Sequence, residues 1–388
     1  MKKIELFYFI AGLIALASCS REKVNTLVEI HIDPSQVESA YDIAGDIESE
    51  WDIIALETTD NYLISAINKL YYQNGIYYLL DKNGHTVFLY DSSGKAISKL
   101  YKKGEGPDEY SMIEALAIVD KNIWVSDSNL RSLICYDENL KMTDRYKTFD
   151  IMSVYDMVTI DGNICVAANW SGWNDQNIEC GIYNTANREI TGFLHVPKQK
   201  EEIATFKKTN QLAGSENSCL FIHSYCDTIF QLSNNEFSPA YKAVFKERYE
   251  DIPLPIEKIM EPSLAHIIRG MENIKQTSQN IFISYLDTRK FMTAMYNKSK
   301  GVCRVYHYLI NSNIGALPIF LYNAFFDENN IISVHEASEV LDFFGNESNL
   351  AKIKNESDRK KIETIMSSID PYSNPVLIRY KLKPNSSL

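Results

Sequence analysis

The sequence predicts an all-β protein, and specifically a six-bladed β-propeller. Short β-rich runs alternate with turns of Asn, Asp, Ser and Gly along most of the 388 residues, which is typical of strands joined by tight turns. One phrase, a turn followed by an apolar run, recurs at a spacing that suits one four-stranded blade per repeat. These runs begin at Ile76, Ile123, Ile164, Cys219, Ile281 and Ile331. Six repeats predict six blades.

The first repeat displays the pattern most clearly. Asn74-Gly75 precedes an apolar run over residues 76–80, and polar turns separate it from further runs over 86–90 and 96–101. Each of the first five repeats offers four such runs. We therefore expect four strands per blade, ordered from the axis of the ring outward.

The two ends of the chain are expected to meet in the last blade. The sixth repeat offers strands over 318–326, 331–337 and 375–382 and lacks an outer strand, while residues 51–56 form a strand without a partner of their own. Placing 51–56 beside 375–382 pairs both and leaves no open edge.

Three motifs resemble those of a known family, the six-bladed β-propeller lipoproteins of Bacteroidota, which are distantly similar to NHL-repeat propellers. The segment Gly104-Glu105-Gly106-Pro107-Asp108-Glu109-Tyr110 is similar to its G-x-G-P-x-E-Y motif. Asp227-Thr228-Ile229-Phe230, followed by Pro239-Ala240-Tyr241, and Asn374-Pro375-Val376-Leu377 resemble two further motifs. The resemblance covers about residues 51–383 and implies a fold and a location, because no molecular function is established for the family.

The N-terminus has the pattern of a lipoprotein signal peptide. Lys2 and Lys3 precede an apolar stretch over residues 6–17, which is too short for a stable membrane span. Leu16-Ala17-Ser18-Cys19 is similar to a bacterial lipobox, which predicts removal of residues 1–18 and lipid attachment to Cys19. The alternative is an ordinary signal peptide with a chance cysteine. Residues 20–23 lack the acidic run often used for surface export, which favours a periplasm-facing anchor over a surface-exposed one.

Residues 19–50 are predicted to be a polar tether with one short strand over 27–32, and residues 51–388 to be the propeller. The last blade carries a predicted helical insert over about 341–374, because apolar residues within 347–370 follow helical spacing. A flap packed on the propeller is favoured over a partner-binding helix. A long Pro-containing loop over 246–269 is expected between blades four and five.

The net charge of −12 argues against nucleic acid and against anionic membrane surfaces as partners. Contact with the membrane is therefore expected through the N-terminal lipid only. An envelope protein or a glycan or peptide ligand stays possible, and we expect a monomer.

The cysteines and histidines give no metal motif. Six cysteines follow Cys19, and their places within apolar runs favour buried free thiols over disulfides, with Cys165–Cys180 as the best candidate pair. They are Cys135, Cys165, Cys180, Cys219, Cys226 and Cys303. No histidine pair has ligand spacing, so no metal ligand and no cofactor is assigned. Calcium or zinc in the central channel stays open, because some propellers take single ligands from several blades.

The segment from Gly104 to Tyr110 has two interpretations. Its glycines suggest a phosphate-binding loop, but Glu105, Asp108 and Glu109 place negative charge where a phosphate needs donors. Pro107 also removes one N–H. A structural crossover between blades one and two is favoured.

The topology predicts where a binding site would lie. In a propeller the turns between second and third strands share one face with the crossovers between blades. That face is expected to collect His85, Asn129, Arg131, residues 169–175, Tyr225, Arg289, Lys290, His335 and Glu336. The candidate binding residues there are Trp170, Trp173, Arg131, Arg289 and His335, since tryptophan and arginine are favoured interface anchors. The alternative is that the two indole rings pack on neighbouring loops.

Three classes of function remain open. The sequence favours an envelope lipoprotein that binds a ligand or partner through one face, since no nucleophile motif or phosphate loop is present and no catalytic residue is assigned. A metal-dependent hydrolase or lyase of the lactonase-like type is the first alternative, and a sensor or signalling component is the second. Carboxylates or histidines converging on the axis would favour the enzyme, and a channel without them would favour binding.

Overall fold

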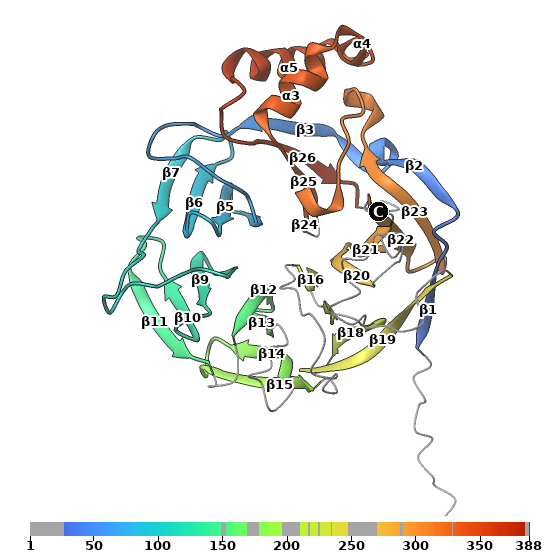
Figure 1. Ribbon diagram of the computed structural model, residues 1–388. Coiled ribbons are helices and arrows are strands. Elements are labelled where there is room, and N and C mark those ends of the chain that lie inside the picture. Colours follow the sequence, from blue (N-terminus) through green and yellow to red (C-terminus); the bar gives the residue numbers. More distant parts are fainter. Residues whose placement is uncertain are drawn as a thin grey trace, which may run out of the picture.

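The computed structural model describes residues 27–388, except 149–152, 169–177, 196–209, 216–217, 224–225, 234, 247–269, 288–289, 328 and 385–387. Six small sheets stand in a ring around a central axis (Figure 1), so the prediction of a six-bladed propeller is confirmed. In each blade the first strand lies innermost and the fourth outermost.

The strands of each blade pair antiparallel in chain order. Blade one contains β4 (Lys69–Gln73), β5 (Ile76–Asp81), β6 (Thr86–Asp91) and β7 (Ala96–Leu100), and blade two β8 (Ala115–Val119), β9 (Asn122–Asp127), β10 (Ser132–Tyr136) and β11 (Met142–Lys147). Blade three contains β12 (Val154–Ile160), β13 (Asn163–Ala168), β14 (Ile178–Asn184) and β15 (Glu189–His195), and blade four β16 (Leu212–Ser215), β17 (Ser218–Ile222), β18 (Thr228–Ser233) and β19 (Glu236–Phe245). Blade five contains β20 (Met271–Gln276), β21 (Asn280–Asp287), β22 (Lys290–Asn297) and β23 (Val302–Ile310).

Tight turns of the expected chemistry connect the inner strands. Asn74 and Gly75 have φ of 52° and 77°, and they join β4 to β5 directly after the pair Gln73–Ile76. Two consecutive residues with positive φ match the right-handed twist of the flanking strands, and Asn and Gly adopt that conformation at low cost. Asp161 and Gly162 repeat this turn between β12 and β13.

Blade six is closed by the N-terminal part of the chain, as predicted. It contains β24 (Ala324–Phe326), β25 (Asn330–His335), β26 (Val376–Leu382) and, outermost, β3 (Ile47–Ala55). Trp51 lies opposite Tyr380 in the register, and both side chains are buried. Asn374 holds the junction, since its Nδ2 donates to the carbonyl of Glu57 at 2.9 Å and its Oδ1 accepts from the backbone N–H of Ile64 at 2.9 Å. The resemblance motif that begins at Asn374 is thus part of the closure.

Residues 27–50 are not a tether, contrary to the sequence-based expectation for 19–50. Strand β1 (Val28–Ile32) lies parallel to β19 at the rim of blade four, and β2 (Val37–Asp42) lies parallel to β23 at the rim of blade five. Ile30 and Ile32 are buried in the core between these blades. The pairing of these two strands was hard to predict from the sequence, because each of them adds to a blade that already has four strands. Residues 19–26 lie outside the described residues.

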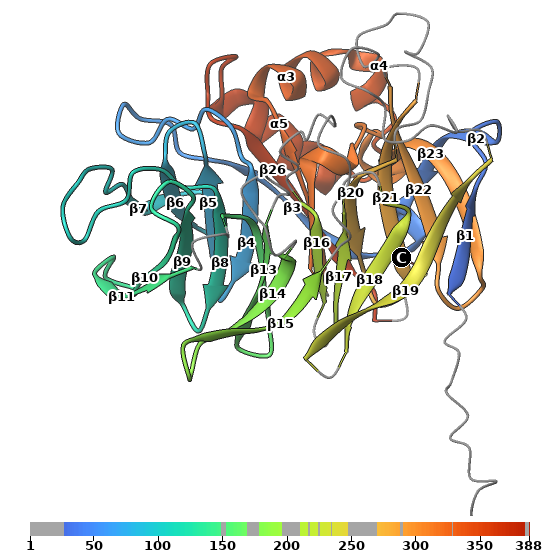
Figure 2. The same cartoon turned by 60° about the horizontal axis from the view of Figure 1, so that its bottom comes forward.

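The predicted helical insert is present between β25 and β26. It contains α3 (Ala337–Gly345), α4 (Glu347–Leu350) and α5 (Glu356–Ser368), which lie together on one face of the ring (Figure 2). Helix α5 packs on β3, where Trp51 Nε1 donates to Asp358 Oδ1 at 2.9 Å and Lys361 Nζ lies 5.2 Å from the indole centroid. Buried residues of the insert, among them Phe344 and Ile362, extend the core of blade six. The structure thus has the packed flap that the sequence favoured.

The six cysteines after residue 19 are all free thiols, so Cys165 and Cys180 are not joined. Both are buried, and burial raises the pKa of the Cys180 thiol well above its ordinary value. These thiols act as small apolar core residues. Among the residues that the structure describes, no helix is long and apolar enough to cross a membrane.

Candidate ligand-binding channel

The candidate site residues from the sequence have different places. Cys19, Trp170, Trp173 and Arg289 lie outside the described residues. Arg131 is partly buried in the turn between β9 and β10, with φ of 47°.

His335, the remaining candidate, ends β25 and is 2% exposed. Its Nε2 lies 2.9 Å from Ser333 Oγ and its Nδ1 3.4 Å from Glu339 Oε2. It is therefore enclosed beneath α3 and is not presented to a partner.

The segment from Gly104 to Tyr110 forms the crossover from β7 to β8. The Glu109 carboxylate accepts a hydrogen bond from the Gly106 N–H at 2.7 Å, and a Cβ on Gly104 would lie 2.0 Å from Glu109 Oε2. The Tyr110 hydroxyl accepts from the Lys102 N–H at 2.9 Å and donates to the His85 carbonyl at 2.8 Å. The protein's own carboxylate thus fills the place that a phosphate would need.

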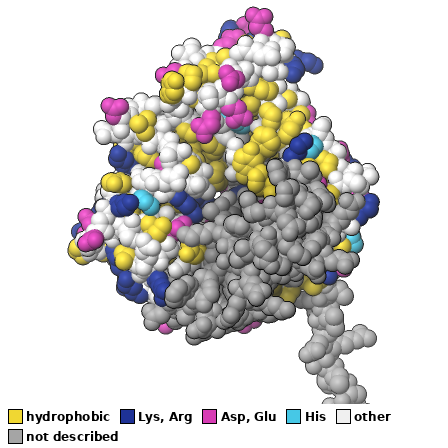
Figure 3. Space-filling view, viewed as in Figure 1, with side chains coloured by type: hydrophobic (Ala, Val, Ile, Leu, Met, Phe, Trp, Pro, Cys, Tyr) yellow, Lys and Arg dark blue, Asp and Glu magenta, His cyan; other side chains and the backbone are white. Residues whose placement is uncertain are grey.

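A cluster of partly exposed aromatic rings lies on the face that carries the helices. Phe291 and Tyr322 are 46% and 45% exposed, and their ring centroids are 5.4 Å apart. Phe320 stacks on Tyr322 at 5.3 Å, and Tyr308 meets Phe320 edge-on at 5.6 Å. Figure 3 shows hydrophobic side chains gathered over blades five and six on this face. We call Phe291, Tyr308, Phe320 and Tyr322 the aromatic cluster.

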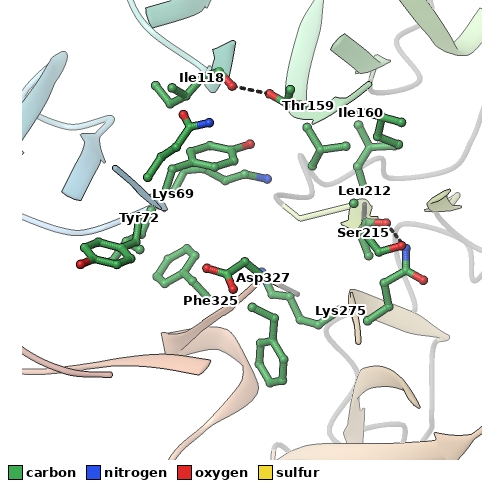
Figure 4. A pocket seen from close by; sticks show the side chains of 18 of the residues that line it. Lys69, Tyr72, Ile118, Thr159, Ile160, Leu212, Ser215, Lys275, Phe325 and Asp327 are labelled. Carbon is green, nitrogen blue, oxygen red and sulfur yellow. Dashed lines mark hydrogen bonds between the residues drawn. The ribbon is translucent and has the colours of Figure 1, made fainter. Parts of the chain in front are cut away.

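A cavity of about 310 Å³ lies on the axis of the ring, where the inner strands of all six blades meet (Figure 4). Its lining includes Gln73, at the end of β4, with Asp161 and Asp327 from the turns after β12 and β24. Those turns join first strands to second strands, whereas the helical insert joins a second strand to a third. Because successive strands of a blade run antiparallel, the turns after first strands and the insert after a second strand lie on opposite faces of the ring. The cavity therefore opens on the face away from the helices and the aromatic cluster.

Lys69 and Asp156 form a buried ion pair that joins three blades at this cavity. Lys69 Nζ, in blade one, lies 2.8 Å from Asp156 Oδ1 in blade three, and Asp156 Oδ2 accepts from the Leu212 N–H of blade four at 2.9 Å. The side chains are 11% and 4% exposed. Burial lowers the pKa of Lys69 and the Asp156 carboxylate raises it, with a net rise. Lys69 therefore stays charged.

Lys275 is the second cation of the cavity, and among the described residues no carboxylate forms an ion pair with it, although the Asp156 charge raises its pKa to a smaller extent. It lies on β20, is 8% exposed, and places its Nζ 5.2 Å from the centroid of the Phe325 ring. Figure 4 shows the side chains of both lysines within the cavity lining. Among the described residues, no hydrogen bond or ion pair reaches its ammonium group. Burial, together with the charge of Lys69, lowers the pKa of Lys275 to about 7.

Several other polar side chains of the lining are already engaged in hydrogen bonds. Gln276 Nε2 donates to the Ala213 carbonyl at 2.6 Å, and Thr159 Oγ1 to the Ile118 carbonyl at 2.8 Å. Asp327 Oδ1 accepts from the Asn330 N–H at 2.7 Å. Within the described part of the chain no three His, Cys, Asp or Glu side chains are grouped to hold a metal ion. The chemistry that this cavity offers is therefore that of Lys275.

Sequence comparison identifies the family. A model described as "Domain of unknown function (DUF4934)" matches residues 30–381. The chain belongs to this family. The DUF4934 match begins within β1 and ends within β26, so it includes the rim strands and the closing strand β3. No curated protein matches the sequence.

Two solved structures support the fold. A Bacteroides fragilis protein described as exported aligns with a TM-score of 0.67 at 14% identity, over 92% of this DUF4934 chain and 100% of that chain. A member of the duf4221 family from Bacteroides vulgatus aligns with a TM-score of 0.51 at 11% identity, over 88% and 99% of the two chains. At these identities the likeness concerns the fold alone, and it confirms the propeller, while the family match over residues 30–381 supports the family resemblance expected from the motifs.

Proposed function

We propose that this protein is an exported, lipid-anchored propeller that binds a small anionic ligand in its axial cavity. The observation that carries the proposal is Lys275, a buried lysine without an anionic partner among the described residues. Export is supported by the signal sequence that precedes Cys19. It is also supported by the similarity to the B. fragilis protein, which is described as exported.

Burial of the Lys275 charge is costly without an anion. A buried ammonium group is unfavourable unless it is paired or loses its proton, and Lys69 already uses the Asp156 carboxylate. A ligand carboxylate or similar group would supply the missing anion at Lys275. A volume of about 310 Å³ is at the lower end of the range for small-molecule sites. The ligand is therefore expected to be small and to carry its charge at one end.

The substitution Lys275→Met tests this proposal. Because it removes the cation and keeps the length of the side chain, it should weaken binding of small carboxylates by roughly 10- to 100-fold, the worth of a hydrogen bond to a charged group. Titration calorimetry with acetate, lactate and pyruvate measures the loss. Affinity for wild type should also fall roughly tenfold per pH unit above about 7, because the anion binds the protonated form and the free lysine loses its proton there.

The control is Lys95→Met, which removes an exposed lysine from the turn after β6. It should bind as wild type does. Lys275→Met should fold at least as stably as wild type, because it removes a buried unpaired charge. Equal affinity of wild type and Lys275→Met for all three carboxylates would exclude the cavity as an anion site.

A second candidate site is supported by the aromatic cluster. Its rings lie on the face where the topology also predicts Arg131, Arg289, Trp170 and Trp173. Exposed aromatic rings suit an envelope glycan, peptide or protein partner. This face would act independently of the cavity, which opens at the other end of the axis.

Membrane attachment is tested by Cys19→Ser. The cysteine sulfur is the proposed site of lipid attachment, so the variant should lose fatty-acid labelling and move from the membrane fraction to the soluble fraction. Unchanged labelling would exclude the assignment. Protease treatment of intact cells then separates the two orientations: protection is expected for the periplasm-facing anchor that we favour, and digestion for a surface-exposed one.

A further inference from the structure

Lys275 has the surroundings of a reactive amine as well as those of an anion-binding cation. We propose that its Nζ forms a reversible imine with the carbonyl group of a small oxo-carboxylate, a class that includes α-keto acids and aldehyde acids. This inference rests on the proposed function, because it assigns the ligand class of the same cavity. It adds a covalent step that simple anion binding does not require.

The geometry favours a neutral amine. A lysine becomes nucleophilic when it is desolvated in an apolar pocket or lies near another cation, and Lys275 meets both conditions. Phe325 lies against its ammonium group, and Lys69 is held charged in the same lining by Asp156. The remaining carboxylates of the lining, Asp161 and Asp327, belong to turns at the mouth.

The fraction of reactive amine follows from the pKa of about 7. A pKa lowered to about 7 makes a substantial share of Lys275 neutral near neutral pH, whereas only about 1 in 2,500 of an ordinary exposed lysine is neutral there. Both protonation forms are thus available. The ammonium form attracts the ligand carboxylate, and the amine form attacks its carbonyl.

The step is balanced without an external reagent. The Nζ lone pair attacks the carbonyl carbon, the π electrons of the C=O bond move to oxygen, and one proton passes from nitrogen to that oxygen to give a carbinolamine. The nitrogen lone pair then forms the C=N bond as the protonated hydroxyl group leaves as water, and the second N–H proton of nitrogen replaces the proton used in that protonation. One amine and one carbonyl give one imine and one water, with no change in oxidation state. Protonation of the imine restores a positive charge beside the ligand carboxylate.

Lys69 is expected to position the ligand. Its ammonium group has three N–H donors and uses one toward Asp156 Oδ1, so further donors remain for a carboxylate in the cavity. A ligand held by its carboxylate near Lys69 would have its carbonyl free to meet Lys275. Pyruvate and glyoxylate are small enough to test this arrangement.

The experiment is reductive trapping of the full-length protein with pyruvate and sodium cyanoborohydride at pH 7, followed by peptide mass mapping. We expect the Lys275 peptide to acquire the reduced pyruvate adduct at least tenfold faster than peptides with exposed lysines such as Lys95. Lactate, which has similar size and charge but no carbonyl, should give no adduct. With pyruvate below saturation, the labelling rate of Lys275 should peak near pH 7 and then fall as the affinity for the carboxylate falls, whereas exposed lysines should continue to gain reactivity at higher pH.

The possible results separate the two proposals. Adduct on Lys275 that lactate suppresses by competition supports both. Binding of pyruvate and lactate with equal affinity, without an adduct on Lys275, overturns the imine and leaves the anion site in place. Absence of binding by either compound overturns both. Lys275→Arg keeps a cation and loses the nucleophile, so it should retain lactate binding and lose trapping; an adduct elsewhere in the cavity of this variant would contradict the assignment to Lys275.

Discussion

A chain that begins at Ser65 will not form a stable closed ring. Such a truncation removes β3, exposes the edge of β26, and takes away the buried side chains of Trp51, Ile54 and Leu56. Each large buried apolar side chain contributes about 1.5–3 kcal/mol, so the loss is a large part of a typical total of about 5–15 kcal/mol. We expect the truncated protein to lose its cooperative thermal transition, measured by circular dichroism.

Two longer chains serve as controls. A chain beginning at Leu27 keeps all described strands and should melt as the full mature protein does. One beginning at Asp46 retains β3 but loses β1 and β2 with the buried residues Ile30 and Ile32, so it should melt cooperatively at a lower temperature. The sequence alone predicted no cost for that truncation. A cooperative, wild-type transition in the chain that begins at Ser65 would contradict the role of β3.

Asp156→Asn should be the most damaging single substitution at the axis. It removes the only carboxylate paired with Lys69 among the described residues and leaves Lys69 and Lys275 as buried cations. Breaking a buried ion pair from one side typically costs about 3–5 kcal/mol. Urea denaturation at pH 7 measures the change in the free energy of unfolding. The loss should shrink as pH rises, because neutral lysines no longer need an anion in the folded state.

Asp161→Asn is the matched control, since Asp161 is an exposed carboxylate of the same blade, in the turn after β12. Its effect should stay within about 0.5 kcal/mol. The pair Lys69→Met with Asp156→Asn should recover much of the stability lost in Asp156→Asn alone, because it removes the unpaired buried cation and keeps an acceptor for the Leu212 N–H. Equal midpoints for Asp156→Asn and Asp161→Asn would refute the structural role of the ion pair.

The blades could be predicted because their signals are local. Turn residues such as Asn74-Gly75 and Asp161-Gly162 act on their own backbone, and the β-runs beside them differ clearly from the turns. Closure of the ring could be predicted by counting strands. Residues 51–56 had no partner and the last blade lacked an outer strand, so pairing the two ends satisfied both. The strand expected over 27–32 is β1, but its pairing and the whole of β2 were not predicted, since each of these strands pairs with a complete blade more than two hundred residues away in the sequence.

The cavity could not be predicted in the same way. Lys69, Asp156 and Lys275 belong to three different blades, and no spacing in the sequence connects them. Only the closed ring brings them together at its axis. One indication was available: Lys275 lies within the first strand of its blade, between Ile274 and Gln276, and a charged side chain is unusual in an inner strand. The sequence analysis instead favoured the opposite face, where long loops and tryptophans attract attention.

The rim strand β1 bears on how the molecule stands at the membrane. It runs parallel to β19, toward the face that carries the helices, so its first residue, Val28, points back toward the face where the cavity opens. With the lipid on Cys19, as proposed, the stretch up to Val28 spans at most about 30 Å even when fully extended. The propeller would then be attached to the membrane through β1 at its rim. Its cavity mouth would face the bilayer, and the helices and the aromatic cluster would face away from it. Ligands released at the membrane surface would meet the lysine cavity first, while larger partners would approach the far side without passing the lipid headgroups.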